Sequence, residues 1–336
     1  MSIFFRVLGK PGWDNGLFVW VDTGTKIYRL LFDCGENILK DLDQRDIKSI
    51  DYLFLSHLHI DHIAGFDYFF RRNYDREKKP VYIYGPADTV GLIHNRLRGF
   101  KWNLVKGVPG SWFVTEMDSK NISTYLFKTS DGYSKKYIIG KKSFNGLLID
   151  NPDFTVQATF LNHIIPTAAY FVKEKPLFNI NKEALEKTGF TSGPWIGKIK
   201  DLTFTSSGNL LVEDKSYKIK ALREKILQKK EGESIGYLTD FIYERDTAVK
   251  IKKIFRNCDS MICESQYLST EKEYAVKNYH LTAVQAARLA KAVNAKRLLL
   301  FHISDRYKIK DYRTFLLEAR KVFTETYFPT EWKIKP

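Results

Sequence analysis

A short segment of the chain concentrates side chains that can bind metal ions. Residues 57 to 62 read His-Leu-His-Ile-Asp-His, so four such side chains lie within six positions, and they include three of the seven histidines. Imidazole nitrogens and carboxylate oxygens suit zinc and related cations. The segment follows the apolar run Tyr52-Leu53-Phe54-Leu55. This order predicts a strand that delivers metal ligands at its C-terminal end.

The spacing within the segment suggests two metal sites. Side chains alternate along an extended segment, so His57 and His59 point the same way, and a turn then brings Asp61 and His62 to a neighbouring position. One ion could take the first pair and a second ion could take the other. Two metals about 3.5–4 Å apart can activate water and hold a phosphoryl group in line.

Three further polar residues stand directly after apolar runs. His163 follows residues 159–161, Asp240 follows 235–239 and His302 follows 298–301. A lone His or Asp in that setting is more often a cap or turn residue than a ligand, at roughly four to one. The three occur together with the segment 57–62, and this favours metal ligands that are presented at the rim of packed sheets.

The elements that must position these residues are short strands and amphipathic helices. Apolar runs bounded by Gly, Asp and Asn predict strands over residues 3–8, 17–21, 28–32, 52–56, 81–84, 154–161, 169–173, 234–239, 260–264 and 297–301. Helical periodicity follows His62 and covers 87–97, 182–187, 219–229, 245–255, 282–293 and 312–323, with Thr282 as an N-cap. The pattern predicts an α/β (α+β) protein in which packed sheets are covered by helices.

Composition allows a large buried core but leaves the number of domains open. The chain has 336 residues, of which 44% are hydrophobic and 15% aromatic. Two stretches fit the strand and helix pattern poorly. Phe100 to Asp150 is rich in Gly, Ser and Lys and is interpreted as an excursion from the core, a probable insertion. Residues 173–233 carry several glycines among many lysines and are interpreted as an inserted basic arm.

The net charge of +15 favours a polyanionic partner, most often nucleic acid. The alternative explanation of this charge is that the proteins of the source organism are generally rich in lysine. The three cysteines, Cys34, Cys258 and Cys263, are too few for a disulfide framework, which favours the cytoplasm. The N-terminus lacks the layout of a signal peptide, and we find no apolar stretch of the roughly 18 residues that a membrane span needs.

The segment Ser56 to His62 resembles the signature of the metallo-β-lactamase superfamily in its two-metal hydrolase form. More narrowly, the chain resembles the ribonuclease Z family, endonucleases that trim the 3′ trailer of precursor tRNA. The segments that carry this resemblance are Phe32-Asp33-Cys34-Gly35-Glu36, Ile83-Tyr84-Gly85-Pro86, residues 163–167 with Tyr170, Gly193-Pro194-Trp195-Ile196-Gly197-Lys198, His280-Leu281-Thr282 and residues 302–307. The resemblance implies a four-layer αβ/βα sandwich over residues 1–336, with the arm inserted.

The resemblance also implies a set of metal ligands. His57, His59 and His163 would hold one zinc ion, and Asp61, His62 and His302 would hold the other. Asp240 would bridge the two Zn²⁺ ions, for which Mn²⁺ or another divalent metal could substitute. Only His94 among the histidines then lacks a site role, and it is interpreted as an ordinary helix residue.

Further roles follow from the same resemblance. Asp61 would accept a proton from the attacking water. His280 with Glu264 would supply a proton or stabilise charge on the leaving ribose 3′ oxygen. The alternative is that this pair is a structural hydrogen bond between loops. Phosphate contacts are expected from Ser304 and Arg306, although Arg306 could equally be a structural ion pair. RNA contacts are expected from the arm residues Gly193, Pro194, Lys198 and Lys200. The expected partners are precursor tRNA or other structured RNA and a second copy of the chain.

Two other functions stay open at this point. A small-molecule phosphodiesterase would use the same ligands without the arm, and a noncatalytic RNA-binding relative would be expected to have lost some of them. Departures from the family pattern are Cys263, Asp305 and the loop Gly9 to Gly16. That loop lacks the family's Pro-x-Lys-Arg-type sequence and leaves recognition of the RNA end open.

Overall fold

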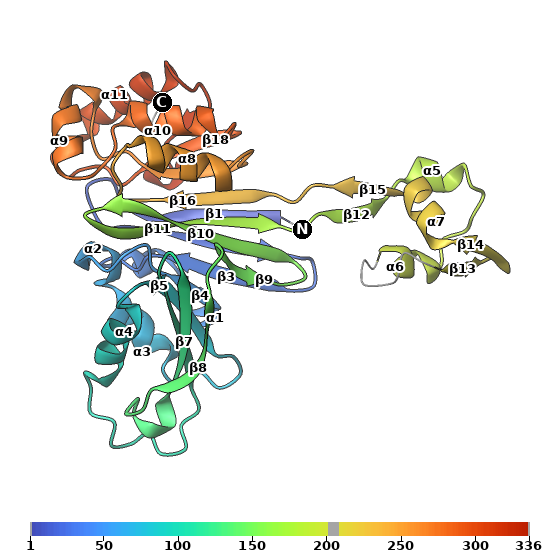
Figure 1. The fold of residues 1–336 in the computed structure, drawn as a ribbon, viewed down its shortest axis with the longest axis horizontal. Coiled ribbons are helices and arrows are strands. Elements are labelled where there is room, and N and C mark those ends of the chain that lie inside the picture. The colour runs from blue at the N-terminus through green and yellow to red at the C-terminus, as the bar shows by residue number, and fades with distance from the viewer. Residues whose placement is uncertain (1, 201–207, 335–336) are drawn as a thin grey trace. The chain divides into compact units, whose positions relative to one another are not determined.

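The computed structural model of the chain describes residues 2–200 and 208–334. Their contacts divide them into two compact units (Figure 1). We call residues 2–173 and 233–334 the body, and residues 174–200 and 208–232 the arm. Each unit is described by itself below.

The first sheet of the body has eight strands that follow one another in chain order. They are β1 Ser2–Gly9, β2 Asn15–Asp22, β3 Ile27–Phe32, β4 Tyr52–Phe54, β5 Val81–Pro86, β6 Ser111–Met117, β7 Asn121–Lys128 and β8 Tyr137–Ser143. Strands β3 to β6 pair in parallel, whereas the pairs at both ends of the sheet are antiparallel. The carboxyl ends of β3 and β4 therefore meet at one edge.

The second sheet has the order β19-β18-β17-β16-β11-β10-β9. Its strands are β9 Leu147–Asp150, β10 Phe154–His163, β11 Ile165–Glu174, β16 Ser234–Leu238, β17 Ser260–Glu264, β18 Arg297–Phe301 and β19 Thr326–Tyr327. Strands β16 to β19 run in parallel. Their shared direction brings the residues that follow β16, β17 and β18 to a common edge.

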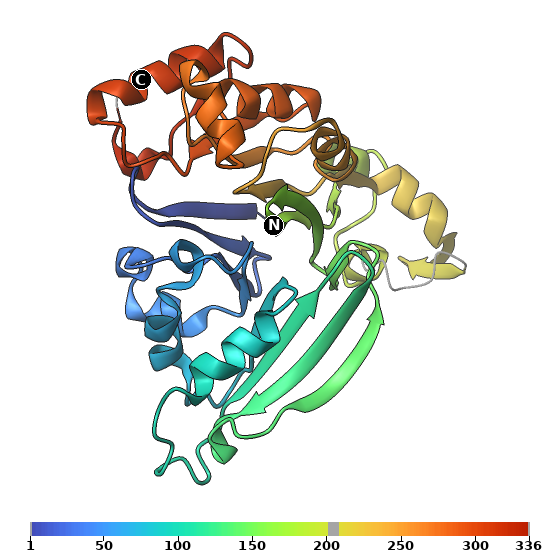
Figure 2. The ribbon, with the colours of Figure 1, turned by 60° about the vertical axis from the view of Figure 1, so that its left-hand side comes forward.

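Apolar side chains fill the space between the two sheets and beneath the helices on both outer faces. Phe32, Phe54, Tyr170 and Tyr237 belong to the cluster between the sheets, where their rings contact one another. A second cluster joins the first sheet to α3 Phe66–Asn73 and α4 Thr89–Arg98. In Figure 2 the blue and cyan helices lie on one side of the strands and the orange and red helices on the other. The expected four-layer sandwich is confirmed.

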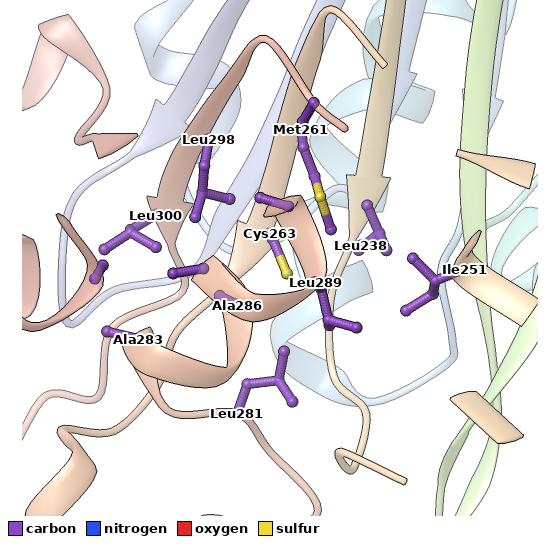
Figure 3. Close-up of a cluster of buried hydrophobic side chains, with 14 of the residues drawn as sticks. Leu238, Ile251, Met261, Cys263, Leu281, Ala283, Ala286, Leu289, Leu298 and Leu300 are labelled. Atoms are coloured by element: carbon purple, nitrogen blue, oxygen red, sulfur yellow. The ribbon is translucent and has the colours of Figure 1, made fainter. Parts of the chain in front are cut away.

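The third cluster lies between the second sheet and the C-terminal helices. Strands β16, β17 and β18 contribute Leu238, Met261, Cys263, Leu298 and Leu300, which face Ala286 and Leu289 of α10 Ala283–Ala292 (Figure 3). The helices α8 Arg245–Ile254 and α11 Ile309–Arg320 complete this layer. The expected N-cap of α10 is confirmed, because Thr282 and Gln285 form a reciprocal capping box.

The remaining short helices of the body lie in connections. They are the 3₁₀ turns Ile38–Asp41, Thr129–Asp131, Ser269–Glu271 and Thr330–Trp332 and the α-helices α1 Gln44–Ser49, α2 Ile60–Ile63 and α9 Lys272–Lys277. Within the described residues we find no helix that is both long and apolar enough to cross a membrane.

The segment Phe100 to Asp150 contributes to the core rather than leaving it. Its strands β6, β7 and β8 extend the first sheet and β9 extends the second. Trp112 and Phe127 are buried against α3 and α4. The expectation of an excursion was therefore wrong for these strands, because Gly, Ser and Lys at turns and on exposed faces hid an alternating pattern. That the segment is an insertion relative to similar proteins stays a prediction.

The arm has its own small core. Strands β12 Leu177–Ile180 and β15 Leu227–Lys230 pair, as do β13 Asn209–Val212 and β14 Lys215–Lys218. Trp195 and Ile199 of α6 Trp195–Lys200 pack with residues of α7 Ile219–Ile226. Leu185 of α5 Lys182–Glu186 packs against the same cluster. The helix expected over 219–229 ends at Ile226, because the next residues pair with β12 instead. Residues 201–207 of the expected arm lie outside the described residues.

Candidate metal centre

The metal-capable residues of the body stand at the carboxyl ends of four strands. His57 follows β4, and His59, Asp61 and His62 lie at the start of α2. His163 ends β10, Asp240 follows β16 by two residues and His302 directly follows β18. The pairing of both sheets brings these strand ends together, so residues more than 200 positions apart in the chain contribute to one centre.

Backbone strain marks three of the strand ends. Asp33, Asp240 and His302 adopt φ values of 58°, 52° and 54°, in the left-handed region that residues other than glycine rarely occupy. Such a conformation costs about 1 kcal/mol and persists where the surrounding structure enforces it, often at functional sites. Asp33 and His302 directly follow β3 and β18, and Asp240 follows β16 by two residues.

Seven side chains form two adjoining groups. Ligand atoms of His57, His59 and His163 lie within 4.8 Å of one another, and so do those of Asp61, His62, Asp240 and His302. Asp240 connects the groups. Its Oδ2 is 3.6 Å from His57 Nε2, 3.7 Å from His163 Nε2 and 3.3 Å from His62 Nε2, and its Oδ1 is 3.6 Å from His302 Nε2.

The donor atoms fit divalent cations. His62 Nε2 is buried and, among the described residues, has no hydrogen-bond partner, although Asp61 Oδ2 and Asp240 Oδ2 each lie 3.3 Å from it. A metal ion would satisfy a buried imidazole nitrogen that faces two carboxylates without a hydrogen bond. Imidazoles with two carboxylates form the donor set that borderline divalent metals prefer.

The charge states of these groups agree with metal binding. Burial and the neighbouring His62 lower the pKa of His57 to about 2, and burial also lowers the pKa of His163. Burial opposes ionisation of Asp240, but the charges of His302 and His62 hold its pKa well below the usual value. Neutral imidazoles and ionised carboxylates are the forms that bind metals. His62 differs from these groups, because burial opposes its protonation but Asp240 and Asp33 outweigh burial and raise its pKa, so positive charge is favoured on this imidazole.

A fully buried carboxylate behind the ligands, that of Asp33, was missed as a site residue by the sequence reasoning. Its Oδ2 accepts hydrogen bonds from His62 Nδ1 at 2.7 Å, Ser56 Oγ at 2.7 Å and Tyr237 Oη at 2.8 Å, and its Oδ1 accepts one from Ser56 N at 2.6 Å. A carboxylate in this position fixes the orientation and tautomer of a metal-binding imidazole. The signal was available, since Asp33 also follows an apolar run directly.

Other ligands are held in a similar way. His163 Nδ1 donates to the backbone oxygen of Tyr279 at 2.9 Å. The Ser56 hydroxyl lies 3.0 Å from His57 Nδ1, and the side-chain amide of Gln266 lies 3.3 Å from His302 Nδ1. These contacts orient the opposite ring nitrogens toward the centre.

The Glu264 and His280 side chains lie directly beside the metal centre. His280 Nδ1 donates to Glu264 Oε2 at 2.9 Å, and the His280 ring centroid is 4.9 Å from that of His163 and 5.6 Å from that of His302. Burial favours neutral His280, but the Glu264 carboxylate outweighs it and raises the pKa of His280 to about 9. Glu264 also accepts hydrogen bonds from Phe241 N and Leu281 N, so it ties loops together as well.

The two expected phosphate-binding residues, Ser304 and Arg306, differ in the contacts that their side chains make. Ser304 is partly buried two residues after His302. Arg306 forms an ion pair with Glu271 at 3.0 Å, and its guanidinium lies 5.0 Å from the ring centroids of Tyr267 and Tyr274. These contacts match the alternative of a structural ion pair, and a phosphate contact by Arg306 stays a prediction.

The remaining residues of interest are not among the seven side chains. His94 Nε2 donates to the backbone oxygen of Tyr133 at 2.8 Å and its ring stacks on Phe127, which agrees with a structural role within α4. In the arm, Lys198, Lys200 and Pro194 are exposed and Gly193 is half-buried. Their contact with RNA stays a prediction.

Known proteins resemble the chain in sequence and in fold. Ribonuclease Z of Deinococcus radiodurans is 32% identical over 97% of this chain and 97% of its own length. The metallo-β-lactamase fold protein YhfI of Bacillus subtilis superposes with a TM-score of 0.58 at 17% identity, covering 97% of this chain and 95% of its own. The short form of human tRNase Z gives a TM-score of 0.52 at 20% identity, covering 91% and 94%.

One family profile matches part of the chain. It is described as Anti-Pycsar protein Apyc1 and covers residues 19–107, which is less than half of the sequence. This match includes the segment 57–62 but excludes His163, Asp240 and His302. The two structural matches establish the metallo-β-lactamase fold.

Proposed function

The chain belongs to the ribonuclease Z family, and on that premise we propose that it is a metal-dependent endonuclease that removes the 3′ trailer from precursor tRNA. The observation that carries the proposal is the pair of ligand groups joined by Asp240, together with the Asp33 carboxylate that orients His62. A noncatalytic relative would not be expected to keep all seven ligand side chains converged.

We assign His57, His59 and His163 to one metal ion, and Asp61, His62 and His302 to a second, with Asp240 shared. The pair would be two zinc ions, or Mn²⁺ or another divalent metal. Bound there, the metals would lower the pKa of water and neutralise charge on the phosphate. Three imidazoles in one group, and two imidazoles with two carboxylates in the other, support this assignment.

Two sets of side chains would handle the protons. Asp61 belongs to the second group. Burial opposes ionisation of its carboxylate, but the neighbouring His302 and His62 outweigh burial and hold its pKa well below the usual value. Asp61 would accept the proton of the attacking water. His280 is kept protonated by Glu264 and would donate a proton to the departing ribose 3′ oxygen.

The arm would hold the RNA. Its exposed Lys198 and Lys200 follow the glycine–proline pair Gly193-Pro194, and α6 is fixed from beneath by buried Trp195 and Ile199. Structured RNA offers mainly shape and phosphates to a protein, and lysines on a small rigid unit suit both. A homodimer and a cytoplasmic location are further expectations from the family.

The test is incubation of the purified protein with a 3′-extended precursor tRNA. We expect one cut near the discriminator nucleotide, loss of activity with a chelator and its return with Zn²⁺ or Mn²⁺. Robust hydrolysis of bis(p-nitrophenyl) phosphate without any cut in the RNA would support a small-molecule phosphodiesterase instead. Metal analysis that finds well under one ion per active chain would contradict the two-metal assignment.

A further inference from the structure

A groove in the body opens between the helix α8 and the strand β10. Its volume is about 370 Å³, which lies within the range of sites for small organic ligands. Four segments line it: Ser119 in the turn between β6 and β7, residues 144–146 between β8 and β9, residues 157–160 of β10, and Lys250, Lys253 and Ile254 in the second half of α8. None of these residues belongs to the metal ligands assigned above.

The walls of the groove are fixed by the fold. Phe144 N donates to Lys120 O at 2.7 Å, which ties the segment before β9 to the turn between β6 and β7. Ala158 N donates to Gly146 O at 2.8 Å and joins the same segment to β10. On the opposite wall, the buried Ile251 anchors α8 in the core beneath it. The groove is therefore preformed, and a ligand would not have to order it.

Lysine side chains give the groove a positive charge. Lys250 and Lys253 are exposed and lie three residues apart on α8, so they share one face of the helix. Lys250 Nζ donates to Phe160 O at 3.2 Å, which uses one of its three N–H donors and holds the ammonium group over the groove. Asp118, which precedes Ser119, directs its carboxylate to backbone N–H groups of its own turn. Among the described residues that line the groove there is no carboxylate, so the groove favours an anion.

Two aromatic rings line the groove together with the lysines. Phe144 and Phe160 are half-buried, and their ring centroids are 6.3 Å apart at an interplanar angle of 69°. Both pack against the core between the sheets, which holds the rings in place while part of their surface faces the groove. The polar side chains of Asn145, Gln157 and Thr159 line the same groove and can pair with the edge of a base. Aromatic, cationic and amide groups together suit a nucleotide better than an inorganic anion.

We propose that this groove is a second binding site of the protein and that it takes a nucleoside phosphate. The phosphate lies between the two lysines, and the base packs against the two phenylalanines. A free nucleotide and a nucleotide within a single RNA strand share this chemistry, so the test includes both. Phe160 precedes the ligand His163 by three residues, about 10 Å along β10, so the site is separate from the metal centre and its occupation does not depend on cleavage.

The test is isothermal titration calorimetry of the full chain with uridine 5′-monophosphate and, separately, with a short single-stranded oligouridylate. Lys253→Glu should weaken binding by roughly 10-fold or more, because it replaces a charge-assisted hydrogen bond by repulsion. Lys252→Glu is the matched control, since Lys252 is exposed on the same helix and undergoes the same change of charge but does not line the groove. Phe144→Leu keeps an apolar side chain and should weaken binding by roughly 5-fold or more through loss of stacking.

Irradiation of bound 4-thiouridine 5′-monophosphate, followed by peptide mapping, locates the base. Adducts within residues 144–160 support the inference, whereas adducts only within 57–62 or 302–307 overturn it, because the nucleotide then binds at the metal centre alone. A selective effect of Lys253→Glu on the oligouridylate alone assigns the site to an RNA strand, and one on the mononucleotide alone assigns it to free nucleotides. Equal effects of Lys253→Glu and Lys252→Glu, or no binding of either ligand, overturn the inference. The proposed function is tested by cleavage and would stand in that case.

Discussion

Replacing Asp33 by asparagine removes one charge behind the metal centre with almost no change in shape. The carboxylate is fully buried and accepts four hydrogen bonds, from His62, Tyr237 and twice from Ser56. Asparagine tolerates the left-handed backbone of this position as well as aspartate does, so no backbone strain is added. The effect of the substitution is therefore confined to charge and hydrogen bonding.

The amide cannot satisfy all of the donors around it. If its oxygen takes the place of Oδ2, its NH₂ group faces the Ser56 N–H, and if it is flipped, the NH₂ group faces His62 Nδ1–H. The two hydroxyls can rotate and accept, but the backbone N–H and the imidazole N–H cannot. Either orientation leaves a buried donor unsatisfied, which costs about 1–3 kcal/mol in free energy of unfolding. Loss of the partner of His62 should weaken metal binding by roughly 10- to 100-fold.

Asp33→Asn is best measured beside Asp51→Asn. Asp51 is also a buried carboxylate, but its partners are Arg29 N and Lys79 Nζ. Urea unfolding in a chelator should show lower stability for both variants, while competition with a metal indicator should show weaker binding for Asp33→Asn alone. Equal metal affinity in Asp33→Asn and wild type would refute the orienting role of Asp33.

Three further predictions concern proton transfer and RNA binding. Asp61→Ala should abolish turnover of precursor tRNA while its circular dichroism stays that of the wild type, and retained activity would exclude Asp61 as the proton acceptor. In the metal-free protein, the raised pKa of His280 means that its contact with Glu264 stabilises the fold fully below pH 6.5 and ceases to do so as pH rises through about 9. Urea unfolding of His280→Gln against wild type across this window should show the difference disappear at high pH. Lys198→Glu with Lys200→Glu should raise KM for precursor tRNA and reduce its salt dependence, and an equal loss on bis(p-nitrophenyl) phosphate would contradict an RNA contact.

The ligand positions could be predicted because their signal is local. His163, Asp240 and His302 each follow an apolar run that forms a strand, and the parallel register of β16, β17 and β18 then gathers strand ends. The fold class followed from the same runs. Asp33 obeys the same rule, but its role depends on four donors from distant segments, which a local pattern does not contain.

Long-range pairing explains the structural expectations that failed. β6 and β7 have weak patterns of their own and are stabilised by neighbours on both sides and by the helices that cover Trp112. The predicted end of α7 was wrong because residues 227–230 have a strand partner in β12.

The positive φ angles at Asp33, Asp240 and His302 have a consequence for evolution in the laboratory. Glycine would relieve the backbone cost at Asp240 and His302, whose side chains serve the metal centre, whereas at Asp33 it would leave four buried donors without their acceptor. Stability and activity therefore favour different residues at Asp240 and His302. Under selection for heat resistance without selection for cleavage, we expect glycine to accumulate there early, so that the most thermostable descendants of this protein would be inactive.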